Sequence, residues 1–133
     1  SSSTDTAPQQ SPEEAEQAAW DNMMAIHDAV MPKMADLNRV SRELKTFAME
    51  TVNKKETERI NDMVDDLEKA SEGMMEWMGE LQQLSRLRVE KSHEEIMDYL
   101  EEETEEIEEV REDMNESLRE GQEMLRELKP VTE

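Results

Sequence analysis

Apolar residues recur at alternating spacings of three and four over three long stretches of the 133-residue chain. The first stretch follows Ser11, Pro12 and Glu14, where Ser11 and Glu14 match a capping box and Pro12 suits the first helical position. Such spacing gathers apolar side chains on one face of a helix, so we predict a helix over residues 12–50. Its seam is Trp20, Met23, His27, Val30, Met34, Leu37, Ser41, Leu44 and Ala48.

Two further helices carry the same signals. Asn53 with Glu56, and Ser92 with Glu95, repeat the capping pattern, and a new apolar seam follows each pair. We therefore expect helices over about residues 54–86 and 93–129, with the second one fading between Ser85 and Lys91. The two seams are Ile60, Met63, Leu67, Ala70, Met74, Trp77, Leu81 and Leu84, and then Ile96, Leu100, Glu103, Ile107, Val110, Met114, Ser117, Gly121, Met124 and Leu128.

Short connections make sequential helices antiparallel neighbours. The fold class expected for residues 11–130 is therefore all-α, an up-down-up antiparallel three-helix bundle of long, coiled-coil-like helices. Pro32 removes one backbone hydrogen bond inside the first helix, which predicts a kink or a break there. Neither Gly nor Pro stands between Glu80 and Ser92, so one continuous helix in an oligomeric coiled coil is the alternative.

The balance of charged residues limits the classes of partner that the chain can bind. The chain carries 36 acidic and 15 basic side chains, a formal net charge of −21. This excess argues against a nucleic-acid surface and against polybasic docking on an anionic lipid leaflet. The chain contains no cysteine, which excludes disulfides and zinc-thiolate sites. No apolar run approaches the roughly 18 residues that a membrane-spanning helix needs.

Residues 1–10 have no large apolar side chain and are expected to be a disordered tether. A Ser-rich spacer ahead of a domain is common in bacterial proteins exported with a lipid on an N-terminal cysteine, and an ordinary disordered tail has the same composition. We expect an exported protein, periplasmic or lipid-anchored at the cell envelope. Contact with the membrane would then run only through an anchor outside these residues.

Three segments carry a family resemblance: residues 26–34, residues 75–78, and Tyr99-Leu100 ahead of an acidic helix. Over roughly residues 20–128 the chain resembles small helical, often lipid-anchored bacterial proteins of unknown function that are labelled viral A-type inclusion proteins. The resemblance implies export and a helical bundle, and it implies no chemistry.

Candidates for catalytic residues are few, because the chain has two histidines and no cysteine. A narrow helical bundle also has little room for the water-poor pocket in which catalysis takes place. We expect no enzyme activity and no cofactor. The sharpest constellation is Met23, His27 and Met31, which share one helical face and match the soft ligands that Cu(I) or Ag(I) prefers. Methionine also fills apolar cores, so packing is the competing interpretation.

Charged residues segregate once the helices are placed antiparallel. The acidic tract of residues 101–109 is expected to be a solvated face. Glu103 lies on the apolar seam, so its side chain is expected either to extend outward to solvent or to meet a basic partner such as Arg86, Arg88 or Lys91. His93 is expected to be exposed. Basic residues gather at the opposite end, where Lys54, Lys55 and Arg59 are the candidates for binding an anionic partner.

These expectations favour an interaction or structural component of the bacterial cell envelope, a monomer or small homo-oligomer with an unknown protein partner. The alternative is a weak binder of metal ions or other cations, through the Met23, His27 and Met31 face or through the acidic helix.

Overall fold

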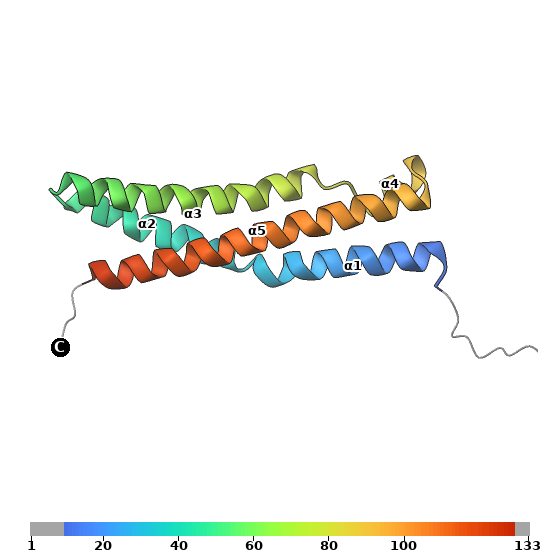
Figure 1. Ribbon diagram of the computed structural model, residues 1–133, viewed down its shortest axis with the longest axis horizontal. Coiled ribbons are helices and arrows are strands. Elements are labelled where there is room, and N and C mark those ends of the chain that lie inside the picture. The colour runs from blue at the N-terminus through green and yellow to red at the C-terminus, as the bar shows by residue number, and fades with distance from the viewer. Residues whose placement is uncertain (1–9, 130–133) are drawn as a thin grey trace, which may run out of the picture.

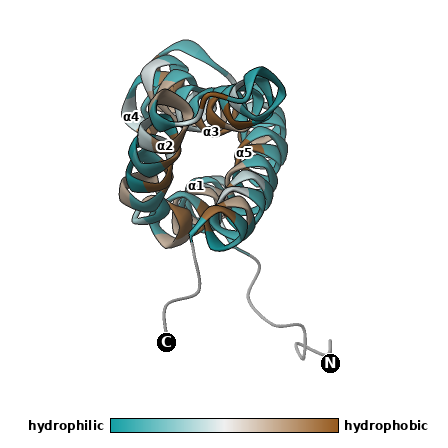
Figure 2. Ribbon diagram, turned by 90° about the vertical axis from the view of Figure 1, so that its left-hand side faces the viewer, coloured by the Kyte–Doolittle hydropathy of each residue, from teal (hydrophilic) through white to brown (hydrophobic). Residues whose placement is uncertain are grey.

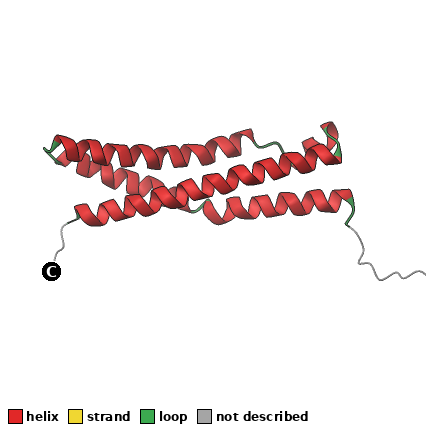
Figure 3. Ribbon diagram, viewed as in Figure 1, coloured by secondary structure: helices red, strands yellow, loops and turns green. Residues whose placement is uncertain are grey.

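The computed structural model describes residues 10–129, which form α-helices joined by short connections (Figure 3). No strand occurs within these residues, so the expected all-α class is confirmed. The helix count differs from expectation, because the described residues form five helices. The tether expected at residues 1–10 lies, except for Gln10, outside the described residues. The helices are α1 (Pro12–Val30), α2 (Lys33–Glu50), α3 (Lys54–Glu80), α4 (Leu84–Glu90) and α5 (His93–Leu128).

The first expected helix is interrupted at Met31 and Pro32. The backbone N–H of Met31 still donates to the His27 carbonyl, but Pro32 has no N–H to continue the ladder. The N–H of Met34 donates instead to the Met31 carbonyl, three residues back, at 3.0 Å. The break that Pro32 predicted is therefore confirmed, and a single uninterrupted helix over residues 12–50 is wrong.

The second expected helix ends earlier than its seam suggested. Leu81 and Gln83 have extended backbones, so α3 stops at Glu80 and α4 is a separate helix. The hydroxyl of Tyr99 accepts a hydrogen bond from the Gln82 N–H at 2.8 Å, which satisfies an amide that the broken helix releases. Helix α4 then ends at an extended Lys91, so the chain does not continue as one helix into α5.

The helices form an elongated body (Figure 1). Helices α1 and α2 run one way along its length, α3 returns, and α5 runs in the first direction again. Apolar residues line the interior between them (Figure 2). Helix α2 packs against both α3 and α5, and α3 also packs against α5. Helix α1 packs against α5 and α4, and it does not form a packed pair with α3.

The body therefore has two unlike halves, which meet where Lys33 of α2 bonds Asn115 of α5. In the closed half, residues 33–69 and 112–129, three helices pack on one another. A Cβ added at Gly121 there would lie 2.9 Å from Val40 and 3.2 Å from Leu67, which shows how closely α2, α3 and α5 approach. In the open half, residues 12–32 and 70–111, α5 lies between α1 and α3, and α4 closes the end.

Candidate functional site

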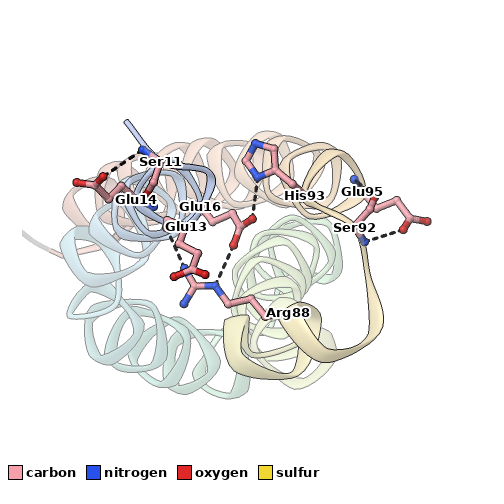
Figure 4. Close-up of polar contacts among 8 residues, drawn as sticks. All are labelled: Ser11, Glu13, Glu14, Glu16, Arg88, Ser92, His93 and Glu95. Carbon is pink, nitrogen blue, oxygen red and sulfur yellow. Dashed lines mark hydrogen bonds and ion pairs between the residues drawn. The ribbon is translucent and has the colours of Figure 1, made fainter. Parts of the chain in front are cut away.

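Three helices are tied together at the end of the open half by one buried carboxylate (Figure 4). Glu16 lies on the inner face of α1, and its side chain is only 5% exposed. Arg88 of α4 donates from Nε to one carboxylate oxygen at 2.9 Å, and His93 Nδ1 of α5 contacts the other at 2.7 Å. Arg88 also donates to the Glu13 carbonyl at 2.9 Å. We call Glu16, Arg88 and His93 the end cluster.

The positions of these side chains follow from local sequence. Capping boxes at Ser11 and Ser92 fix the starts of α1 and α5, and both are formed as the sequence predicted. The hydrogen bonds from Arg88 and then from His93 hold the pKa of Glu16 below its usual value. Glu16 is thus a stable buried anion, a structural tie between three helices.

The end cluster was not predicted from the sequence. His93 is exposed as expected, yet one of its ring nitrogens meets Glu16. One feature of the sequence could have indicated that Glu16 is buried: it lies seven residues before Met23, on the same face of α1 as the apolar seam. A carboxylate at such a position requires a buried partner.

Glu103 is the second carboxylate on a seam, and its surroundings are the opposite of those of Glu16. Desolvation, then the neighbouring Glu106, Glu80 and Glu102, raise its pKa to about 7. The expected basic partners are engaged elsewhere, because Arg86 pairs with Glu90 and Arg88 with Glu16. Within residues 10–129 no ion pair joins Glu103 to a basic side chain, so the alternative with a basic partner is wrong.

The predicted soft-metal residues lie on the inner side of α1. Met23 is fully buried and Met31 partly so. The His27 ring is stacked on Trp77 of α3, with centroids 5.8 Å apart. Its Nδ1 lies 2.9 Å from the Asp28 carboxylate, and its buried Nε2 has no hydrogen-bond partner. Residues 10–129 hold no group of three His, Cys, Asp or Glu side chains suited to a metal, so any site here rests on the methionines.

The predicted partner-binding residues lie at the far end of the closed half. Lys54 and Lys55 are exposed in the first turn of α3. Arg59 is paired with Glu56 at 3.2 Å and with Glu127 at 3.4 Å. Its neighbour Glu56 raises the pKa of Arg59, so the guanidinium is firmly charged but already engaged. This end offers fewer free cations than its sequence suggested.

Charge divides unequally between the halves. The open half carries 19 Asp and Glu against 4 Lys and Arg, and the closed half carries 15 against 11. Three cations of the closed half pair with carboxylates of another helix: Lys45 with Glu68, Arg59 with Glu127, and Lys129 with Glu43. The open half is therefore the strongly negative part of the molecule.

Hollows along the surface of α5 are shallow and mostly charged. Two of them lie between α3 and α5, and the one in the open half is lined by Gly73, Glu76, Trp77, Glu80, Glu106, Glu109, Val110 and Asp113. Small-molecule sites are predominantly apolar and enclose their ligand, which this hollow does not.

Comparisons of the chain with protein-family models, curated proteins and solved structures gave no match. None of the helices in residues 10–129 combines the length and the apolar character required to cross a membrane. The site itself is therefore the basis for any functional proposal.

Proposed function

We propose that this chain is a non-catalytic interaction protein that meets a cationic protein partner with its open half. The supporting observation is the charge division, 19 carboxylates against 4 cations in the open half. An excess of this size steers oppositely charged partners and repels like-charged ones.

The proposal has three further parts. We propose that the five helices act as three rods in up-down-up order, namely α1 with α2, α3 with α4, and α5. We also propose export to the bacterial cell envelope, for which the Ser-rich composition of residues 1–10 is the support. The absence of catalysis is proposed because the hollows along α5 are shallow and lined mainly by carboxylates.

The experiment is capture of partners from native cell extract by the full chain and by two charge variants. The first variant changes Glu105, Glu106 and Glu108 to Gln, and the second changes Lys54, Lys55 and Arg59 to Glu. We expect the first to lose the captured partner and the second to keep it, with capture falling as NaCl is raised. Loss confined to the second variant would overturn the proposal and support an anionic partner at the basic end.

A second candidate function is binding of Cu(I) or Ag(I) by Met23, His27 and Met31. The observation that favours it is the His27 ring, whose Nε2 is buried without a partner while Nδ1 faces the Asp28 carboxylate. An imidazole that donates from Nδ1 presents the Nε2 lone pair, the arrangement that metal-ligating histidines adopt.

Calorimetric titration with Ag(I) tests this candidate. We expect one ion per chain, lost in the His27→Ala and Met23→Leu double variant and kept in Met49→Leu, where the methionine is exposed at the other end. Circular dichroism must show that the double variant keeps its helicity. Equal binding by the wild type and the double variant would exclude this site.

A further inference from the structure

One flank of α3 is covered by α2 in the closed half and left uncovered in the open half. Val64, Ser71, Met75 and Met78 follow one another at helical spacing along this flank. Val64 is buried, and the Ser71 hydroxyl contacts the Met34 sulfur of α2 at 3.8 Å. Beyond the start of α2 the flank continues into solvent, where Met75 is 58% and Met78 39% exposed.

The facing flank of α1 is also apolar. Because His27 stacks on Trp77, this side of α1 is directed toward α3. Trp20, Met24 and Met31 lie on the same side of α1 at helical spacing from His27, and each is only partly buried. Helix α1 nevertheless packs on α5 and α4 and forms no packed pair with α3. Two apolar flanks therefore approach each other without a helix that covers both.

We propose that these flanks, which we call the open seam, bind an amphipathic helix with basic flanks. The open seam comprises Trp20, Met24, Met31, Met75 and Met78. The bound helix would take, in the open half, the place that α2 takes in the closed half. From Trp20 to Met31 the seam extends about 17 Å at about 1.5 Å per residue, which suits a helix of about three turns. Methionine-rich surfaces adapt to such helices.

The charge of the open half favours a basic amphipathic helix over a second copy of the chain as the bound partner. The open half has a net formal charge of −15 when its 19 carboxylates are set against its 4 basic residues. Two such halves would repel each other, whereas basic residues that flank an apolar stripe would be attracted by the net negative charge of this half. This inference rests on the proposed function and adds the secondary structure of the partner and the place where it docks.

The test uses the full chain, labelled with ¹³C at its methionine methyl groups, and a synthetic peptide of 14 residues. The peptide has leucine at helical spacing on one face and lysine or arginine elsewhere. A scrambled isomer of the same composition controls for charge. We expect one peptide per chain, with shifts at the Met24, Met31, Met75 and Met78 signals and an unchanged signal from exposed Met49.

Two double variants locate the site. Met75→Gln with Met78→Gln removes apolar surface from the open seam, and we expect affinity for the peptide to fall about tenfold. Met49→Gln with Val52→Gln removes even more exposed apolar side chains from the opposite end and should change affinity less than twofold. Glutamine keeps the helix propensity, so folding is preserved.

Several outcomes would overturn the inference. If the scrambled isomer binds as tightly, or if both double variants behave alike, the open seam is not the docking site, although a cationic partner still stands. If neither peptide binds, the cationic partner fails as well. If sedimentation shows that the chain dimerises through Met75 and Met78, the occupant is a second copy and this proposal is wrong.

Discussion

The closed and open halves are built from the same kind of seam, yet they end in different states. In the closed half Val40, Leu44 and Leu67 are essentially without solvent exposure between three mutually packed helices. In the open half the α2-side flank of α3 carries the exposed Met75 and Met78. The halves meet near Pro32: after it α2 packs on both α3 and α5, and before it α1 packs on α5 and α4.

The halves also differ in how charge is compensated. Ion pairs between helices join Lys45 to Glu68 and Arg59 to Glu127 in the closed half. The open half concentrates its cross-helix pairing at the end cluster around Glu16. Its other seam carboxylate, Glu103, is desolvated among acidic neighbours. The closed half thus pairs charges across its helices, and the open half holds uncompensated charge beside uncovered apolar surface.

Truncation of apolar side chains should give the largest difference between the halves in the free energy of unfolding. Leu67 is 1% exposed, and we expect Leu67→Ala to lower the free energy of unfolding by about 3 kcal/mol through lost burial and a cavity. Met75→Ala in the open seam should lower it by less than about 1 kcal/mol, because Met75 is 58% exposed and buries little apolar surface on folding. Urea unfolding measures both. Similar losses in the two variants would mean that the open seam is packed in solution.

Removal of the end-cluster cation should have the next largest effect. In Arg88→Ala the buried Glu16 loses a charged donor, and we expect a loss of about 2 kcal/mol in the free energy of unfolding. The matched control is Arg86→Ala, where an exposed arginine on the same helix is paired only with Glu90. That variant should lose less than about 0.5 kcal/mol. Equal losses would show that Glu16 is solvated and that the cluster is not a tie.

A smaller effect, dependent on pH, is expected at Glu103. Its pKa is raised on folding from the ordinary 4.5 to about 7, so the folded chain binds this proton more tightly than the unfolded chain does. The stability associated with it is present below pH 4.5 and is lost as pH rises through 7. Glu103→Gln should therefore raise the free energy of unfolding by about 1 kcal/mol at pH 8 and leave it unchanged at pH 4.

Exposed Glu105 provides the control for this change, since Glu105→Gln should alter stability little at either pH. Thermal melts at the two pH values measure the effect. The opposite sign, a Glu103→Gln variant that is less stable at pH 8 than the wild type, would mean that the carboxylate has a cationic partner.

Local signals in the sequence predicted the helix starts well. Ser11, Asn53 and Ser92 all accept the expected hydrogen bonds, because a cap depends on residues three apart. The break after Glu80 could not be predicted in this way. It is accompanied by a hydrogen bond from Gln82 to Tyr99, 17 residues further on, which exists only after α5 has packed.

The candidate site was predicted less completely than the fold. His27 was singled out correctly as a residue of the inner face, but its stacking on Trp77 and its unpartnered nitrogen depend on how α1 meets α3. Arg59 pairs with Glu56, three residues before it, which helical spacing could have indicated, and with Glu127, 68 residues away, which it could not. The open seam exists because one flank of α3 has no neighbouring helix in the open half. The spacing of apolar residues along the chain cannot show which flank stays uncovered.

Photo-crosslinking in the native cell tests the partner site most directly. A photoreactive residue replaces Met78 in the open seam in one strain and Val52, exposed at the opposite end, in another. We expect a covalent adduct with a basic protein from position 78, its crosslinked peptide amphipathic and lysine- or arginine-rich, and no adduct from position 52. Adducts from position 52 alone, or equal adducts from both positions, would contradict the assignment of the open half as the interaction surface.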